Sequence, residues 1–498
     1  MENGMIKELY GKICERTDTR ACLIALKKEI REEGGKRALA YLLAGDYSEF
    51  ALLLKDEDAK VRKNTAFILG EMECEDMLPR LWDAYQTEEQ LFVRPAYLRA
   101  MSAYDCRVYV PELKKRRDYL LNAPVTEAAV KHVREEAAAL RALLLKYEKE
   151  KKHVFTGLAR ETDIYLMTNR EHREITAGQL KEEKPALFPG GVRIRTRDLQ
   201  KLDRIRTWSE MLFPIRGAAS IPAEPQEAAK VLVKSELMDF LKSCHEGSMP
   251  FYFRLEVRGR MEQARKNAFI KRFTAALELA TGRELVNSAS SYEIELRLLQ
   301  KKSGDFVPLL KLYTRKDRRF SYRRNVLAAS IQPVSAALIM ELLRPYLKEH
   351  AQVLDPFCGV GTMLIERVYL MAADPVYGID IYGEAIAKAR ENAETAKMQI
   401  NFINRDFLDF HHEYRFDEII TNMPTVTGTK SMEEITQLYE KFFLKAREVL
   451  KEDGVLALYT TEESILLHCL KLYDFLKVEK KWVIREKEGS VLYVLKMI

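Results

Sequence analysis

The sequence has few cysteines, glycines and prolines for its 498 residues: 7 Cys, 22 Gly and 16 Pro. That composition excludes a fibrous or low-complexity chain. The cysteines are scattered and form no Cys-x-x-Cys pair, so their spacing offers no zinc site and no redox dithiol. No apolar run reaches the roughly 18 residues of a membrane span, and residues 1–12 do not resemble a signal peptide. We therefore expect a soluble, cytoplasmic protein with reduced thiols.

A large excess of one charge sign is also missing, since 81 Lys and Arg against 75 Asp and Glu leave a net charge of +6. The excess is concentrated in residues 251–324, where 18 basic and 8 acidic residues give +10. A basic stretch with aromatic residues at 315–324 predicts contacts with the phosphates and unpaired bases of a nucleic acid. The alternative is a solvated loop with a few ion pairs. The candidate contact residues are Arg315, Lys316, Arg318, Arg319, Tyr322, Arg323 and Arg324.

Residues 1–150 have a helical pattern throughout. The pairs Val61-Arg62 and Val93-Arg94 lie 32 residues apart, and small and apolar residues follow each at helical spacing. This period resembles HEAT-like repeats, in which helix pairs stack because one pair cannot bury its own apolar face. An irregular helical domain is the alternative. A closing helix is predicted over 124–150.

Residues 153–320 have a mixed α+β pattern. A helix is predicted over 261–281, and Pro222 and Pro225 indicate a loop. Alternating side chains predict strands within 156–166 and over 191–196, 251–258, 292–299 and 306–313.

Residues 353–366 are the most informative segment. A short apolar run ends at Asp355, a turn with Gly359 and Gly361 follows, and a helical pattern begins near Thr362. Glycines let the backbone approach a ligand closely, and a helix N-terminus favours polar or anionic groups. The next apolar run ends at Asp380, where an acid could accept hydrogen bonds from ribose hydroxyls.

Strands and helices then alternate to the end of the chain. This alternation implies a doubly wound α/β sheet, which binds ligands beyond the carboxyl ends of its strands. Strands are predicted over 376–380, 401–404, 416–421 and 455–460, helices over 384–396 and 433–450, and a final hairpin over 476–484 and 490–497.

Four motifs of this region resemble those of the class I S-adenosylmethionine-dependent methyltransferases, which have a seven-stranded Rossmann-like sheet. They are Asp-Pro-Phe-Cys-Gly-Val-Gly-Thr at 355–362, Gly-Ile-Asp at 378–380, Asp406, and Asn-Met-Pro-Thr at 422–425. Tyr322-Arg323-Arg324, followed by Ser330-Ile331-Gln332-Pro333, is similar to the approach to the first motif in THUMP-containing RNA methyltransferases. The expected organisation is an all-α HEAT-like domain (1–150), a THUMP-like α+β RNA-binding region (153–320) and a methyltransferase domain (321–498).

The resemblance implies S-adenosylmethionine as the cofactor. In the family, the acid matched by Asp380 binds the ribose hydroxyls, the acid matched by Asp406 accepts from the adenine amine, and the loop after the first strand lies around the methionine part and ribose. The implied cofactor-binding residues are Asp355, Phe357, Cys358, Gly359, Gly361, Thr362, Asp380, Ile381, Asp406, Phe407, Asn422 and Ser330.

The implied catalytic residues are Asn422, Met423, Pro424 and Thr425, which match the family's Asn/Asp-Pro-Pro-Tyr/Phe motif. There, the Asn side chain and a backbone carbonyl hold the target amine with its lone pair toward the methyl group. Thr425 departs from the motif because it cannot stack on the base, an interaction of about 1–3 kcal/mol. Either another ring replaces it, or the base is held differently, or activity is weak or lost.

The leading hypothesis is an RNA methyltransferase that N-methylates an exocyclic amine of guanine or adenine in tRNA or rRNA, with a protein partner possible at the helical repeats. The alternatives are a non-catalytic RNA-binding scaffold of the same fold, a nicotinamide-dependent oxidoreductase and a small-molecule methyltransferase. Methylation of cytosine C5 is disfavoured because no Cys lies between Asp406 and Thr460. His411 and His412 lack metal-ligand spacing, so we expect no metal.

Overall fold

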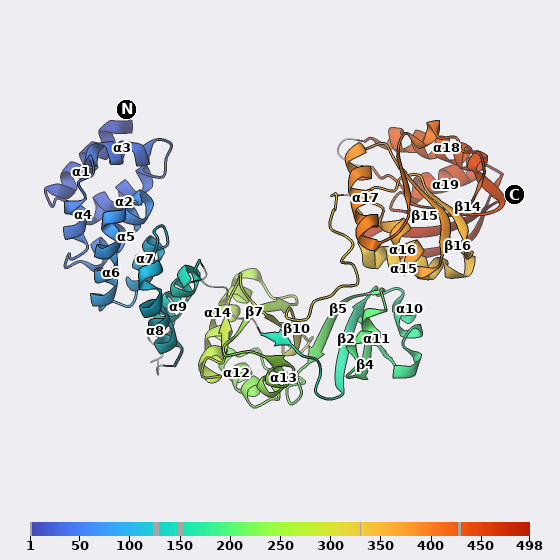
Figure 1. Ribbon diagram of the computed structural model, residues 1–498. Helices are drawn as coiled ribbons and strands as arrows, with labels where there is room; N and C mark the ends of the chain where they lie inside the picture. The colour runs from blue at the N-terminus through green and yellow to red at the C-terminus, as the bar shows by residue number, and fades with distance from the viewer. Residues whose placement is uncertain (1, 123–128, 145, 148–152, 329, 427–429) are drawn as a thin grey trace.

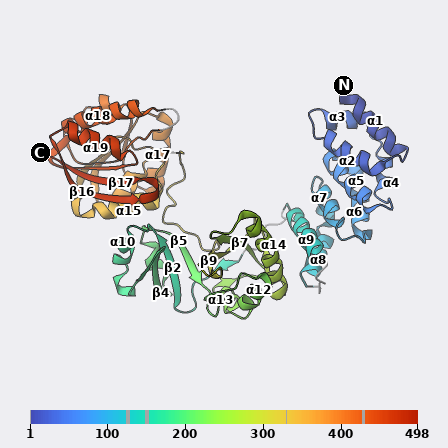
Figure 2. The ribbon, with the colours of Figure 1, turned by 180° about the vertical axis from the view of Figure 1, so that it is seen from behind.

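The computed structural model describes residues 2–122, 129–144, 146–147, 153–328, 330–426 and 430–498. The chain forms three parts in a row, with an α+β part between an N-terminal helical part and a C-terminal part built on a second sheet (Figures 1 and 2). Within the described residues, no helix has the length and apolar character needed to cross a membrane.

The described residues of the first part form helices joined by short turns. Helices α2, α5, α7 and α9 pack in a row, each against the next, while α4, α6 and α8 lie beside their successors. A Cβ on Gly70 would come within 2.7 Å of the Ala100 backbone, so this glycine lets α5 and α7 approach closely. The helices are α1 (Glu2–Cys14), α2 (Thr19–Glu29), α3 (Gly35–Leu43), α4 (Ser48–Leu53), α5 (Ala59–Met72), α6 (Leu78–Thr87), α7 (Arg94–Met101), α8 (Val110–Asn122) and α9 (Val130–Leu144).

Stacked helix pairs are what the repeat interpretation requires, and the HEAT-like assignment itself stays a prediction. Of the closing helix predicted over 124–150, the structure shows α9, while 124–128, 145 and 148–150 lie outside the described residues.

The middle part is an eight-stranded sheet of order β3-β4-β2-β5-β10-β9-β7-β8, with a small β1-β6 pair beside it. Along β7, Phe251 and Phe253 point into the core while Tyr252 and Arg254 stay partly exposed. The strands are β1 (Val154–Phe155), β2 (Thr162–Thr168), β3 (Ala186–Phe188), β4 (Gly191–Thr196), β5 (Trp208–Pro214), β6 (His245–Glu246), β7 (Phe251–Arg258), β8 (Leu285–Asn287), β9 (Ile294–Gln300) and β10 (Phe306–Leu312). The helices are α10 (Arg173–Gly178), α11 (Leu199–Asp203), α12 (Pro225–Val233), α13 (Leu237–Ser243) and α14 (Gln263–Ala280).

The loop interpretation of Pro225 was wrong, because this residue occupies the first turn of α12. A proline is tolerated there, since the first amide groups of a helix have no intrahelical acceptor. The sequence analysis also missed the strands β1, β3, β5, β6 and β8 and the helices α10 to α13, and β2 ends two residues beyond the segment 156–166 in which a strand was predicted. The elements β4, β7, β9, β10 and α14 agree with the predicted bounds to within two residues.

The C-terminal part confirms the predicted seven-stranded sheet, with strand order β13-β12-β11-β14-β15-β17-β16. Strand β17 is antiparallel to both neighbours, and β11 to β15 are parallel. Adjacent residues of one strand enter opposite cores, as Ile419 and Ile420 do, because helices cover both faces. The elements are α15 (Pro333–Leu343), β11 (Ala351–Asp355), α16 (Thr362–Leu370), β12 (Ala373–Asp380), α17 (Gly383–Ala396), β13 (Asn401–Asn404), β14 (Phe416–Asn422), α18 (Met432–Val449), β15 (Leu450–Thr460), α19 (Glu463–Leu472), β16 (Leu476–Arg485) and β17 (Ser490–Met497).

Candidate functional site

The candidate site lies at the carboxyl ends of β11, β12 and β14, where the strand order reverses direction. Strand β11 pairs with β12 on one side and with β14 on the other, so Asp355, Asp380 and Asn422 end neighbouring parallel strands. From this point the chain connections run in opposite directions along the sheet. This makes it the usual ligand position in a doubly wound sheet.

Asp355 is the most buried acid of the site, with 1% of its surface exposed. Its Oδ1 accepts a hydrogen bond from the Phe357 amide at 3.1 Å, which folds the loop back over the strand end. Burial raises the pKa of Asp355 to about 7, and the neighbouring Asp380 carboxylate adds to the shift. This carboxyl therefore titrates near neutral pH.

Asp380 fastens the glycine loop to the second strand. Its Oδ2 accepts from the Gly359 amide at 2.9 Å, and its Oδ1 accepts from the Tyr382 amide at the same distance. The residue is only half-buried, and the adjacent Ile381 leaves 59% of its surface exposed although it is apolar. A carboxylate beside an exposed aliphatic side chain suits a ribose with an attached base.

The two glycines of the loop have different surroundings. Both have positive φ, 53° at Gly359 and 80° at Gly361, which favours glycine. A Cβ on Gly361 would meet the Phe402 ring at 2.9 Å, whereas a Cβ on Gly359 would have no protein atom within 4 Å. Gly361 is thus required by packing, and Gly359 borders open space that a ligand could fill.

Asp406 and Phe407 follow β13. The Asp406 side chain accepts from the Leu408 amide at 2.9 Å and caps a short turn, while remaining half-buried. The Phe407 ring is buried and contacts Phe357 and Phe442, with ring centroids 6.2 Å and 5.8 Å away. These contacts join the turn to the glycine loop.

Three further candidates for cofactor binding are Cys358, Thr362 and Ser330. Cys358 is buried, and burial raises the pKa of its thiol well above the usual range, so it is no nucleophile. The Thr362 hydroxyl is buried and has no hydrogen-bond partner among the described residues. The Ser330 hydroxyl accepts from the Leu327 amide at 2.9 Å and orders the segment before α15.

The sequence analysis missed Asn392, which holds the glycine loop from behind. This fully buried side chain donates to the Val360 and Asn325 carbonyls, both at 3.1 Å, and accepts from the Asn325 amide at 3.1 Å. Its position on α17 gives no local signal, because all its partners are distant in sequence.

Asn422 ends β14 half-buried, and its carboxamide has no hydrogen-bond partner within the part of the chain that the structure describes. The residues that follow are held in place by hydrogen bonds of their backbone groups. Met423 is buried and its amide donates to the Tyr459 carbonyl at 2.9 Å, and the Pro424 carbonyl accepts from the Tyr439 hydroxyl at 3.1 Å. Thr425 follows, half-buried.

The basic stretch 315–324 divides into buried and exposed residues. The Arg319 guanidinium lies 3.1 Å from the centre of the Trp208 ring and donates to the Ile205 and Trp208 carbonyls. The Tyr322 hydroxyl donates to Glu366 at 2.6 Å in the interior. Neither side chain is accessible to an RNA.

The remaining residues of that stretch lie nearer the surface. Arg315 forms an ion pair with Asp203, and Arg323 donates to the Ile331 carbonyl. Lys316, Arg318 and Arg324 are exposed.

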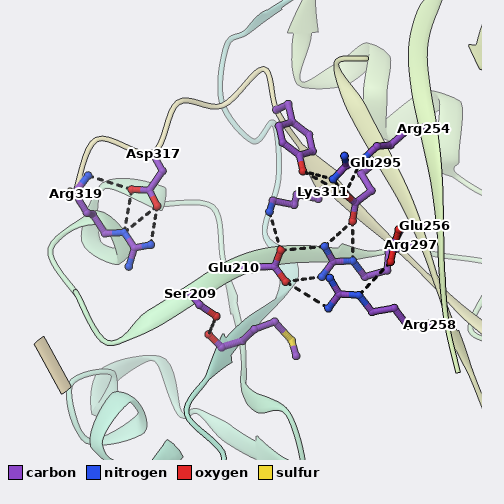
Figure 3. Close-up of polar contacts among 12 residues, drawn as sticks. Ser209, Glu210, Arg254, Glu256, Arg258, Glu295, Arg297, Lys311, Asp317 and Arg319 are labelled. Carbon is purple, nitrogen blue, oxygen red and sulfur yellow. Dashed lines mark hydrogen bonds and ion pairs between the residues drawn. The ribbon is translucent and has the colours of Figure 1, made fainter. Parts of the chain in front are cut away.

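Part of the basic excess in residues 251–324 is neutralised within the middle sheet (Figure 3). Glu210 of β5 accepts hydrogen bonds from Arg297 of β9 and Lys311 of β10. These bonds, that of Arg297 above all, lower the pKa of Glu210 to about 2. Glu295 accepts from Arg254 in the same network, so the local charge of +10 overstates what a ligand meets.

Residues 321–488 match the family model described as the RMKL-like methyltransferase domain. This part of the chain is a methyltransferase domain. S-adenosylmethionine is the cofactor of this domain. The carboxylates of Asp355 and Asp380, the exposed Ile381 and the open space at Gly359 fit such a group.

Similar curated proteins match about a quarter of the chain. A ribosomal protein L11 methyltransferase of Dictyoglomus turgidum is 31% identical over 118 residues, which are 24% of this chain and 35% of that protein. A tRNA (guanine(10)-N2)-dimethyltransferase of Methanothermobacter thermautotrophicus is 29% identical over 121 residues, 23% of this chain and 35% of that protein. The chain thus spans about a third of the length of these relatives.

Solved structures match a larger share of the chain. The SMU.472 structure has a TM-score of 0.52 at 13% identity, over 68% of this chain and 99% of that one. A predicted N6-adenine-specific DNA methylase from Listeria monocytogenes str. 4b F2365 has a TM-score of 0.52 at 15% identity, over 67% of this chain and 96% of that one. At these identities the likeness shows the fold alone, over about two thirds of the chain.

Proposed function

We propose that this protein is an S-adenosylmethionine-dependent RNA methyltransferase that N-methylates an exocyclic amine of guanine or adenine in tRNA or rRNA. The observation that carries the proposal is Asn422: its carboxamide has no partner among the described residues and ends the strand next to Asp355. An amide oxygen at this place can accept a hydrogen bond from a base amine and orient its nitrogen.

When bound, S-adenosylmethionine would supply a methyl group on a positively charged sulfur: the amine nitrogen would bond to the methyl carbon as the carbon–sulfur bond breaks, leaving a neutral thioether, and the nitrogen would lose a proton to water. The chain's own contribution is to hold that nitrogen in line. Because the Pro424 carbonyl already accepts from Tyr439, the Met423 carbonyl is the second acceptor we assign to the amine. Tyr439 and Glu462 stiffen the turn, since Glu462 also accepts from the Val426 amide at 3.1 Å.

RNA as the substrate class is supported by two observations. One similar relative is named as a tRNA (guanine(10)-N2)-dimethyltransferase. Lys316, Arg318 and Arg324 are exposed on the segment that joins the middle part to the methyltransferase domain, where phosphates could approach the site.

A non-catalytic RNA-binding protein of the same fold is the second candidate. Thr425 favours it, because an aromatic ring is absent where the motif normally provides one. Tyr459 is half-buried and is the register partner of Asn422 on the next strand, so a ring does lie beside the motif.

The deciding experiment is transfer of labelled methyl from S-adenosylmethionine to total RNA from a strain lacking this gene, followed by mass spectrometry of the nucleosides. We expect incorporation with the wild type and a loss of at least about 100-fold with Asn422→Ala. Asn267→Ala, an exposed Asn on α14, is the matched control and should retain activity. Cofactor binding without any methyl transfer to RNA would establish the non-catalytic candidate instead.

A further inference from the structure

A cavity of about 250 Å³ lies where α9 meets the turn between β8 and β9, remote from the methyltransferase motifs. Arg117, Arg134 and Arg141 line it from the helical part, and Arg283 and residues 288–291 line it from the middle part. Glu278 is the one acid among its described lining residues, and Asp118 beside the lining forms an ion pair with Arg117, so the four guanidinium groups leave a net charge of +2. Such a cavity favours an anion.

Two of these arginines hold the cavity together. Arg134 donates to both oxygens of Glu278, with Nε···Oε2 2.8 Å and Nη2···Oε1 2.9 Å. Arg141 donates to the Ser291 carbonyl at 2.8 Å, and its guanidinium lies 3.3 Å from the centre of the Tyr252 ring. The helical part therefore provides one wall of the cavity in a defined position.

Arg283 differs from these two. Its half-buried guanidinium forms no hydrogen bond or ion pair with any described residue. The backbone around it is fixed, since its φ is 65° and its amide donates to the Glu278 carbonyl at 2.8 Å. Partial burial lowers the pKa of Arg283, and a bound anion would offset that desolvation.

One aromatic ring, that of Tyr252, lines the cavity, and others follow the lining segment 288–291 in the chain. The chain passes from Ser291 directly to Tyr292, whose ring centre lies 4.3 Å from the Arg254 guanidinium. Tyr313 packs edge-on against Tyr292 at 4.9 Å between centroids and is 39% exposed. Guanidinium groups beside partly exposed rings are typical of surfaces that bind the backbone and the unpaired bases of RNA.

We propose that this cavity binds a backbone phosphate of the RNA, so that helix α9, at the end of the N-terminal helical part, belongs to the RNA-binding surface. The identity of the ligand rests on the proposed function. The position of the bound phosphate in this cavity is argued from Arg283 and from the arginines of α9.

The test compares full-length wild type, Arg283→Gln and Arg37→Gln in binding to labelled bulk tRNA at several salt concentrations. Arg37 is an exposed residue of α3 and does not line the cavity, so it matches the charge change. We expect Arg283→Gln to weaken binding on the order of tenfold and to reduce the salt slope by about one, with no effect of Arg37→Gln.

Thermal shifts with inorganic phosphate form the second arm. Equal tRNA affinity of wild type and Arg283→Gln would overturn the proposal, as would stabilisation of the wild type by phosphate without any tRNA binding.

Methyl transfer is measured on the same RNA. If the wild type methylates RNA and Arg283→Gln binds it normally, only this inference fails. If Arg283→Gln weakens tRNA binding and the wild type transfers no methyl, only the proposed function fails.

Discussion

Arg206 donates two hydrogen bonds to Glu366, Nε···Oε2 2.7 Å and Nη2···Oε1 2.8 Å, across the junction between the middle part and the methyltransferase domain. Glu366 lies in α16, which begins at Thr362 directly after the glycine loop, and Tyr322 is its further donor. The junction thus ties the middle part to the helix that starts at the candidate cofactor site.

The first prediction concerns this pair. Arg206→Leu leaves the Glu366 carboxylate buried with Tyr322 as its remaining donor, so we expect the free energy of unfolding to fall by about 3–5 kcal/mol. Denaturant unfolding followed by tryptophan fluorescence reports it, since Trp208 lies in the middle part near Arg206. Arg31→Leu, which breaks the exposed Arg31–Glu71 pair, should cost at most about 1 kcal/mol. Equal losses for both variants would contradict the role of burial.

The second prediction is a pH dependence set by Asp355. Its pKa of about 7 in the folded protein lies above that of an exposed carboxyl, so the folded state binds an extra proton between about pH 4 and pH 7. Folding stability from this group is therefore present below that window and is lost as the pH rises through it. Asp355→Asn should remove this slope in unfolding experiments at a series of pH values.

The same carboxyl should act on the cofactor in the opposite sense. If Asp355 binds the cationic methionine part, only its ionised form attracts that part, and affinity should rise with pH up to about 7. Calorimetry in buffers of different ionisation enthalpy should show proton release on binding near pH 6. The Asp355→Asn variant should bind the cofactor weakly, with an affinity that does not change with pH. If its affinity still changes with pH, a group other than Asp355 causes the pH dependence.

The third prediction separates the two loop glycines. Gly359→Ala and Gly361→Ala both strain a left-handed backbone, at about 1–2 kcal/mol. Only the second also drives a Cβ into the Phe402 ring. We expect Gly361→Ala to lose stability in thermal unfolding, and Gly359→Ala to lose about tenfold in cofactor affinity with a smaller loss of stability. If Gly359→Ala and Gly361→Ala bind the cofactor with equal affinity, the cofactor does not lie against Gly359.

The sequence was sufficient where a function depends on neighbours in the chain. Asp355, Gly359 and Gly361 follow a strand whose apolar run is plain, and the strand ends at Asp380 and Asn422 could be predicted in the same way. Contacts between segments that are distant in the sequence could not be predicted. The burial of Arg319 depends on Trp208, 111 residues away, and Arg206 finds Glu366 160 residues away. A run of basic residues looks the same whether its members face water or a buried ring.

The last prediction concerns Thr425, which follows the stiff Met423-Pro424 turn beside Asn422. If the missing ring limits activity, Thr425→Phe should restore stacking on the target base and raise kcat/KM for RNA by about 5–150-fold, the equivalent of about 1–3 kcal/mol. Thr425→Val removes the hydroxyl without adding a ring and is the matched control, for which we expect no gain. Single-turnover methyl transfer at saturating cofactor measures both. A loss of activity in Thr425→Phe with unchanged cofactor affinity would show that the base is held without a ring at this position, and Tyr459→Ala would then test whether the adjacent strand provides it.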